Sequence, residues 1–175
     1  MNNNNVAYID GTNLHKATVK HGWMVDYAKL YIWLREKHSI SRAYIFIGYI
    51  HTYEKLYSKM RSAGFVLIFK MTTTDRSGSV KGNCDSDLVL RAVRDVYEEK
   101  FDYAHIVSSD GDFSSLIDFL KEKLKMGSII SPSNDCSILL MRTGISITYL
   151  NELRTKLCID SVAENKKAPD EDKTS

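Results

Sequence analysis

Short, almost uninterrupted apolar runs recur along this chain, and apolar residues repeat at helical spacing in the stretches between them. Runs without polar alternation are typical of strands that are buried on both faces, and their alternation with helices predicts right-handed βαβ units. The six runs cover residues 6–9, 43–50, 65–69, 103–107, 128–130 and 145–149. The sequence therefore predicts an α/β protein with a mainly parallel central sheet, in which 145–149 forms an edge strand.

The segments between the runs predict helices and one long loop. Helices are expected at 26–37, 88–96, 113–120, 137–141 and 151–156. Residues 51–61 interleave Tyr53 and Tyr57 with cations, which suits a nucleic-acid track, but a solvated amphipathic helix is the favoured interpretation. Residues 70–82 form a loop that is long for a compact α/β connection, so a flap over a substrate and a mobile excursion both remain open.

Length and composition fit one domain and exclude several classes of protein. With 175 residues, 43% of them hydrophobic, we expect one domain over 1–161 and a charged, disordered tail over 162–175. No apolar stretch approaches the ~20 residues of a membrane span, and the N-terminus lacks a signal-peptide pattern. Three scattered cysteines form neither a zinc motif nor a disulfide framework. A cytoplasmic protein without a membrane partner is expected.

Acidic side chains occupy three of the turns that lead from a predicted strand or loop into a helix. They are Asp10, Asp85, Asp110 and Asp112. Each turn alone has a purely structural explanation, in which Asp85 and Asp112 cap their helices and Thr12 or Asn13 caps the first one. The combination is more informative, because parallel strands collect their strand-to-helix turns at one edge of the sheet.

Four aspartates at one edge predict a metal site. Two carboxylates ~4 Å apart repel each other by ~4 kcal/mol at an effective dielectric near ~20. Hard divalent cations bind carboxylate oxygens, so Mg²⁺ or Mn²⁺ would hold such a cluster together, and a metal held in this way commonly handles phosphates. The formal charge of +2 does not by itself indicate a nucleic-acid binder, so local cations would have to attract the substrate. The candidates around the rim are Lys70, Arg76, Lys81 and Arg91.

Three motifs carry a resemblance to a known family. They are Ile9-Asp10-Gly-Thr-Asn13-Leu14, the run from Lys81 to Leu88, and Val107-Ser-Ser-Asp-Gly-Asp-Phe113. In this order and on these turns, they resemble the NYN domain of the LabA-like group, within the PIN-like nucleases, over about residues 6–153. The resemblance implies a PIN-like, Rossmann-like three-layer α/β/α sandwich. It also implies a Mg²⁺- or Mn²⁺-dependent endoribonuclease that hydrolyses RNA phosphodiester bonds with a metal-activated water.

The same resemblance assigns roles to individual residues. It places the catalytic and metal-binding acids at Asp10, Asp85, Asp110 and Asp112. It gives Asn13 and Ser108 supporting polar roles and has Lys81 contact substrate phosphate. Arg76, one of the rim cations named above, is expected to bind substrate as well. The chain departs from the pattern at Arg91, where many relatives carry another acid. Either one ligand is then missing or Asp87 replaces it, so one ion is better supported than two.

Two other functions remain as alternatives. An RNA-binding or regulatory module would keep the fold and the pocket without cutting RNA. A phosphohydrolase that resembles the haloacid-dehalogenase enzymes would use Asp10 as its nucleophile, but such enzymes need a second acid two residues later, where this chain has Thr12. RNA is the expected partner of both the nuclease and the RNA-binding module. Whether the protein forms a homo-oligomer is left open.

Overall fold

The computed structural model describes residues 4–70, 73–74, 80–81 and 84–159. The predicted tail at 162–175 and most of the predicted loop at 70–82 lie outside these residues. Within the part of the chain that is described, no helix combines the length and the apolar character needed to cross a bilayer.

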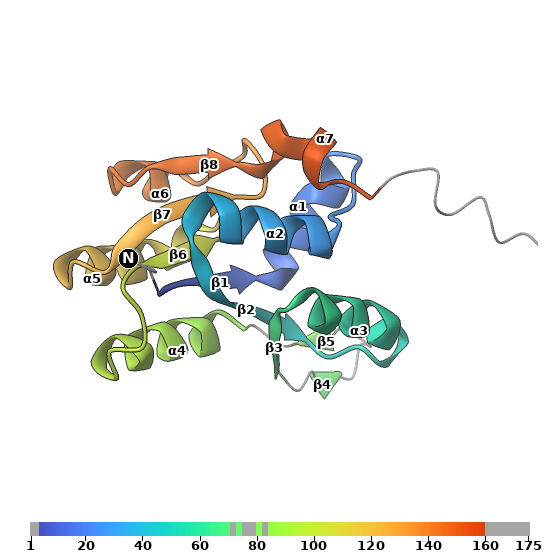
Figure 1. Ribbon diagram of the computed structural model, residues 1–175, viewed down its shortest axis with the longest axis horizontal. Coiled ribbons are helices and arrows are strands. Elements are labelled where there is room, and N and C mark those ends of the chain that lie inside the picture. The colour runs from blue at the N-terminus through green and yellow to red at the C-terminus, as the bar shows by residue number, and fades with distance from the viewer. Residues whose placement is uncertain (1–3, 71–72, 75–79, 82–83, 160–175) are drawn as a thin grey trace, which may run out of the picture.

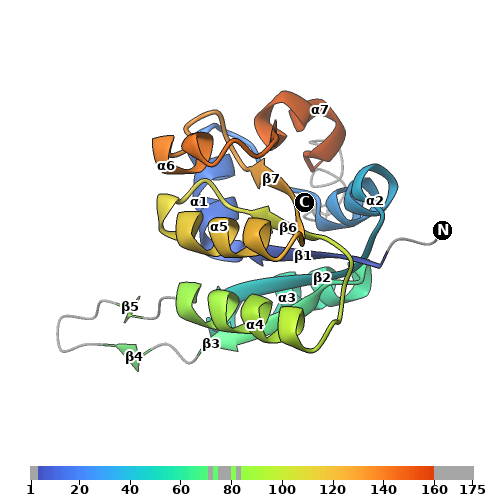
Figure 2. The same cartoon turned by 90° about the vertical axis from the view of Figure 1, so that its left-hand side faces the viewer.

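A six-stranded sheet with the order β3-β2-β1-β6-β7-β8 forms the centre of the molecule (Figure 1). The strands are β1 (Asn5–Asp10), β2 (Ile40–Gly48), β3 (Val66–Lys70), β6 (Ala104–Val107), β7 (Met126–Ser131) and β8 (Ile147–Tyr149). Every neighbouring pair is parallel. All six predicted strands are present, and β8 is an edge strand as predicted. Two short strands, β4 (Thr73–Thr74) and β5 (Val80–Lys81), form a separate antiparallel pair (Figure 2).

The strand order reverses at the centre of the sheet. From β1 the chain builds outward through β2 to β3, and it then returns to place β6 on the other side of β1 and builds outward through β7 to β8. β1 is buried along its whole length, as a continuously apolar central strand should be. Ligands of open α/β sheets bind at such a switch point, outside the carboxyl ends of the strands. Here that position lies beyond the ends of β1 and β6.

Helices cover both faces of the sheet (Figure 2). The α-helices are α1 (Gly11–Lys20), α2 (Tyr27–His38), α3 (Glu54–Ala63), α4 (Asp85–Tyr97), α5 (Ser114–Glu122), α6 (Ile138–Arg142) and α7 (Arg154–Leu157), with single 3₁₀ turns η1 (His51–Tyr53), η2 (Gly111–Phe113) and η3 (Leu150–Leu153). Residues of α4, α5 and α6 pack on one face, and residues of α1, α2, α3 and α7 pack on the other. The predicted three-layer α/β/α sandwich is confirmed.

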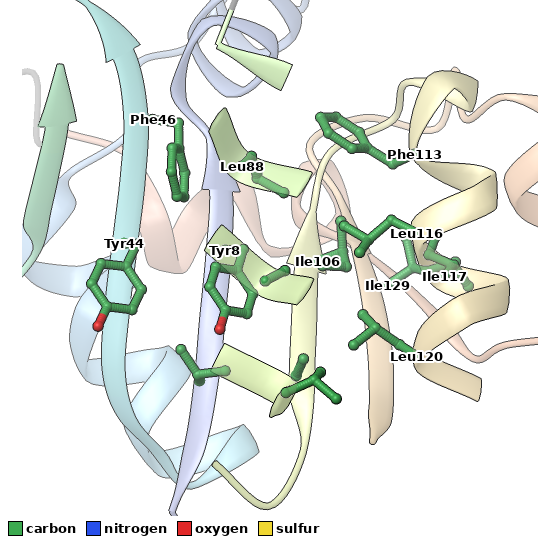
Figure 3. Close-up of a cluster of buried hydrophobic side chains, with 14 of the residues drawn as sticks. Tyr8, Tyr44, Phe46, Leu88, Ile106, Phe113, Leu116, Ile117, Leu120 and Ile129 are labelled. Atoms are coloured by element: carbon green, nitrogen blue, oxygen red, sulfur yellow. The ribbon is translucent and has the colours of Figure 1, made fainter. Parts of the chain in front are cut away.

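One of the two cores joins the sheet to the helices that carry the predicted acidic turns (Figure 3). Tyr8 of β1 and Ile106 of β6 are fully buried beneath Leu88 of α4, and Leu116 of α5 packs into the same cluster. Burying a side chain of this size contributes roughly 1.5–3 kcal/mol. This packing fixes where α4 and α5 begin, and it therefore fixes the positions of the acids at their N-termini.

Helix α1 is the element that the apolar pattern did not predict. Its sequence, GTNLHKATVK, buries only Gly11, Leu14 and Thr18, so no apolar stripe is visible. The hydroxyl of Thr18 is buried and donates to the carbonyl oxygen of Leu14 at 3.0 Å, which satisfies its polar atom within the helix. A Cβ on Gly11 would lie 2.8 Å from Cγ2 of Ile45 and 3.0 Å from the carbonyl oxygen of Phe46. The helix starts so close to β2 that a larger residue would push it away.

The segment at 51–61 is largely an amphipathic helix, as the favoured interpretation predicted. Tyr57 of α3 is fully buried, and its ring contacts the rings of Tyr49 and Phe69. Tyr53 remains 47% exposed at the start of the segment. Because only one of the two tyrosines is accessible, the segment does not present the aligned aromatic surface that a nucleic-acid track would need.

Candidate functional site

The end of β1 holds Asp10 in a buried position at the switch point. The carboxylate is 6% exposed, and its Oδ1 accepts a hydrogen bond from the backbone N–H of Asn13 at 3.0 Å, so Asp10 itself caps α1. The structural explanation that placed Thr12 or Asn13 at this cap was therefore wrong. A buried carboxylate with only one short hydrogen bond from the backbone is poorly solvated, and this distinguishes Asp10 from an ordinary cap.

The other two acidic turns also differ from the cap assignments made on sequence. Asp85 is the first residue of α4, and Cys84 stands at the cap position without a side-chain capping bond. In the turn after β6, Oδ1 of Asp110 accepts from the backbone N–H of Asp112 at 3.0 Å, so Asp110 is the cap and Asp112 is exposed. Neither Asp85 nor Asp112 is therefore the capping residue of its helix.

The fold brings three of the predicted acids together. One carboxylate oxygen from each of Asp85, Asp110 and Asp112 lies within 4.8 Å of the other two. Oxygens bound at ~2.1 Å to one Mg²⁺ are at most ~4.2 Å apart, so only a small side-chain rotation separates this arrangement from a coordinating one. The donors are hard carboxylate oxygens at a solvent-accessible edge, and they fit a divalent cation such as Mg²⁺ or Mn²⁺.

Asp10 lies close enough to two of these carboxylates to be affected by them. Burial, together with the charges of Asp85 and Asp110, raises the pKa of Asp10 to about 6, against the opposing hydrogen bonds from Asn13 and Ser108. A buried acid whose pKa is raised, with other acids beside it, is typical of a functional site. Three of the four acids that the sequence singled out thus form one cluster, and the fourth, Asp10, interacts with two of them at the end of the sheet.

Hydrogen bonds tie the two acidic turns of β1 and β6 together. The side-chain oxygen of Asn13 accepts from the backbone N–H of Ser109 at 3.0 Å and from its hydroxyl at 3.1 Å. The hydroxyl of Ser108 accepts from the backbone N–H of Asp110 at 3.1 Å and donates to Oδ2 of Asp10 at 3.4 Å. Asn13 and Ser108 therefore sit inside the site and hold the carboxylates at fixed positions.

A cavity of about 590 Å³ opens over the acids. Its lining residues are Asp10, Thr12, Asn13, Lys16, Ala17, Lys20, Cys84, Asp85, Ser109, Asp110, Ser133 and Asp135. Lys16 and Lys20 were missed by sequence reasoning, because it considered a helix start at Thr12 or Asn13 and did not follow that helix further. Their spacing of four and eight residues from Thr12 places them on one face of such a helix. Lys20 forms an exposed ion pair with Asp135 at 2.9 Å.

The structure describes the cations predicted around the rim to different extents. Arg76 lies outside the described residues, and Lys81 is described only through the pairing of its backbone with Thr73 in the β4–β5 hairpin. Lys70 forms an ion pair with Asp87 at 3.7 Å. The described residues that line the cavity do not include Lys70, Arg76 or Lys81. Asp87 is likewise not part of the acidic group, so the suggestion that it replaces a missing ligand gains no support.

Arg91 belongs to a separate polar network beneath α4. Both oxygens of Asp95 accept from Nε of Arg91 at 2.9 Å, the guanidinium also donates to the hydroxyl of Tyr44 at 2.6 Å, and the hydroxyl of Tyr8 donates to Asp95 at 2.8 Å. Asp95 is 3% exposed, so its charge depends on these partners. This arrangement explains how a cation is accommodated at position 91, and it directs Arg91 away from the acids.

Comparison with known proteins agrees with this geometry. Residues 5–142 match the NYN domain family. No curated protein matches the chain. A crystal structure of a protein of unknown function from Vibrio parahaemolyticus is similar, with a TM-score of 0.75 and 19% sequence identity over 90% of this chain and 98% of that one. This last likeness concerns the fold alone. Since the family match covers most of the chain, including all four acids and the turns that hold them, the chain belongs to the NYN domain family.

Proposed function

We propose that this protein is a metal-dependent endoribonuclease of the LabA-like group, which hydrolyses RNA phosphodiester bonds with a water molecule as the attacking group. The observation that supports this most directly is the convergence of Asp85, Asp110 and Asp112 within 4.8 Å, from two different helix starts, beside the buried Asp10. NYN domains are generally nuclease-like, and this cluster supplies the ligands such chemistry needs.

Asp85, Asp110 and Asp112 would hold a Mg²⁺ or Mn²⁺ ion, with Asp10 completing the set once it is ionised. When bound, the ion would lower the pKa of a water molecule and neutralise charge on the phosphate. Asn13 and Ser108 fix the separation of the β1 and β6 turns through the hydrogen bonds described above, so their role is to position the acids. The raised pKa of Asp10 means that protons compete with the metal below about pH 6.

Phosphate attraction would come in part from α1. Lys16 is exposed at the cavity wall, one helical turn after the start of the helix that Asp10 caps. Lys20 lies one turn further, where a phosphate would compete with Asp135 for its ammonium group. The two lysines therefore form a short basic track that leads away from the acids. Lys81 and Arg76 remain proposed contacts of the substrate.

The test is a cleavage assay on single-stranded and structured RNA, with a DNA strand of the same sequence as a further substrate, in Mg²⁺, Mn²⁺ or EDTA. We expect cleavage with either metal and none in EDTA. Asp110→Asn should reduce cleavage by at least about 10²-fold, because it removes a ligand charge with little change in shape. Asp118→Asn is the matched control, since Asp118 lies on α5 with 60% of its side chain exposed and is paired only with Lys121 at 3.8 Å.

Three outcomes separate the candidate functions. Full activity of Asp110→Asn would end the nuclease proposal. RNA binding without turnover at any metal concentration would identify a silent binding module instead. Preferential hydrolysis of the DNA strand would leave the metal chemistry intact and replace RNA as the substrate.

A further inference from the structure

A second cavity lies at the opposite edge of the sheet from the acids, where the strands begin. Its volume is about 510 Å³, and it is lined by residues from the start of β1, the C-terminal end of α2 and the starts of β6 and β7. The residues that matter are His38 and His105, with Asn5 beside them. These residues lie far apart in the chain, so sequence reasoning does not predict that they meet.

Three polar atoms in this cavity are buried and have no hydrogen-bond partner. They are Nε2 of His38, Nε2 of His105 and Oδ1 of Asn5. His105 as a whole is 6% exposed, and Asn5 is also 6% exposed. Buried polar atoms are normally paired, so three such atoms around one cavity indicate a missing partner. The described residues contain only one other atom of this kind, Nε2 of His21.

The surrounding structure holds these atoms in place. Nδ1 of His105 lies 2.8 Å from the hydroxyl of Ser128, and with the proton on Nδ1 the lone pair of Nε2 is available to a ligand. Nδ2 of Asn5 donates to the carbonyl oxygen of His38 at 2.8 Å, which fixes the amide so that Oδ1 is the unpaired atom. Each contact occupies one polar atom of the side chain and leaves the other without a partner.

The backbone makes room for the His105 imidazole. The pairing of β6 with β7 shifts register so that His105 pairs with Ser128, and the skipped residue is Gly127. A Cβ at Gly127 would lie 2.6 Å from Cε1 and 2.7 Å from Nε2 of His105. The ring edge that carries the unpaired nitrogen therefore occupies space that any other residue would fill. Such irregularities often re-aim side chains at functional sites.

The separation of the two rings suits a shared ligand. The ring centroids of His38 and His105 are 4.7 Å apart, with the planes inclined at 56°. Two imidazoles bound through Nε2 at ~2.0–2.1 Å to one ion, at roughly tetrahedral angles, have centroids about 5 Å apart. Burial lowers the pKa of His105 to about 4 and also lowers that of His38, so both rings are neutral near pH 7. Lys37 also lines the cavity, but its exposed side chain can keep its ammonium group in water.

From this arrangement we propose a second metal site, in which Nε2 of His38 and Nε2 of His105 bind one transition-metal ion of the Zn²⁺ class and Oδ1 of Asn5 contributes a third donor. Neutral imidazole nitrogens select such ions over Mg²⁺, whose sites are built from oxygen. The two sites therefore differ in the metal they take as well as in position. An ion here would tie α2 to the start of the sheet, and it would not contact the acidic cluster.

The decisive experiment observes the imidazoles directly. Histidine side-chain ¹⁵N resonances are recorded at pH 7.5 while Zn²⁺ is added to Asp110→Asn protein, in which the acidic cluster is weakened. We expect Nε2 of His38 and His105 to shift together and to saturate at one equivalent. His105→Gln should weaken Zn²⁺ binding by more than about tenfold, and Ser128→Ala by about tenfold through loss of the bond that orients the ring. His15→Gln, at an exposed position on α1, is the control and should bind like the parent.

Two results would overturn the site. If neither Nε2 resonance moves up to millimolar Zn²⁺, the three atoms are satisfied by water only. If the same titration shifts the resonances of His15 as much as those of His38 and His105, the binding is a surface effect. Because the spectra of the unsubstituted histidine pair decide the question, the conclusion does not depend on whether His105→Gln folds.

Discussion

Replacing Asp10 by Asn should make the metal-free protein more stable at neutral pH while it removes the metal response. The pKa of Asp10 is raised from 3.8 to about 6 by burial and by Asp85 and Asp110. The folded, metal-free protein therefore binds this proton more tightly than the unfolded chain does. This tighter proton binding contributes to the free energy of unfolding, and the contribution is fully present below about pH 4 and is lost as the pH rises through about 6. Above that pH the ionised carboxylate destabilises the fold by about 3 kcal/mol, at 1.36 kcal/mol per pKa unit.

Asparagine removes this cost without disturbing the turn. Its side-chain oxygen can accept from the N–H of Asn13 as Asp10 does, and Asn is an equally good helix cap. We expect Asp10→Asn to raise the free energy of unfolding in EDTA by 2–3 kcal/mol at pH 7.5, and by less than about 1 kcal/mol at pH 4. The corresponding gain in Tm is roughly 4–12 °C for a chain of this size.

Urea denaturation of both proteins at the two pH values, with EDTA and with saturating Mn²⁺, measures the effect. Mn²⁺ should stabilise the parent by about 2.7 kcal/mol at 100 times its Kd, and it should stabilise Asp10→Asn much less. Asp118→Asn, whose carboxylate is exposed, should behave like the parent throughout. If Asp10→Asn is no more stable than the parent in EDTA at pH 7.5, the electrostatic description of the site is wrong.

Three further substitutions test other parts of the structure. Lys16→Gln should weaken RNA binding and reduce the slope of log affinity against log salt concentration by about one, without changing the cleavage rate of bound RNA. An unchanged slope would show that Lys16 does not contact phosphate. Arg91→Met should lower the free energy of unfolding by about 3–5 kcal/mol, because Asp95 would stay buried without its cation, while Mn²⁺ affinity measured by calorimetry stays the same. A loss of Mn²⁺ affinity would instead connect Arg91 to the site. Gly111→Ala should weaken Mn²⁺ binding, because a Cβ would collide with Oγ of Ser137 and displace the turn that holds Asp110; an unchanged Kd would show that the turn can absorb the shift.

Most of the fold could be predicted because its strands are apolar without interruption. A central strand such as β1 is buried on both faces and therefore shows a pattern that turns and surface helices do not. Helix α1 escaped prediction because Gly11 and Thr18 supply most of its buried face, and neither is recognised as apolar. The β4–β5 hairpin was also not predicted, since strands of two residues are too short to show alternation.

The acids of the candidate site could be predicted because topology alone determines which turns meet. What the sequence did not reveal was the role of each side chain within its turn. Whether Asp10 or Asn13 caps α1 depends on a difference of three residues in where the helix begins, which the pattern of residue types does not resolve. The role of Arg91 could not be predicted either. Its guanidinium donates to Asp95, four residues later, and to Tyr44 of a distant strand, and only the fold brings these groups together.

The reversal of strand order has a consequence for how this protein acquires any metal-dependent activity. Asp10 ends a strand of the half that is made first, whereas Asp110 lies in the turn after a strand of the half that is made last, and the two strands are hydrogen-bonded to each other. A ribosome-bound chain that has emerged only through β3 holds one acid of the four, so it has no competent cluster. The acidic cluster is therefore complete only after the two halves of the sheet have paired through β1 and β6.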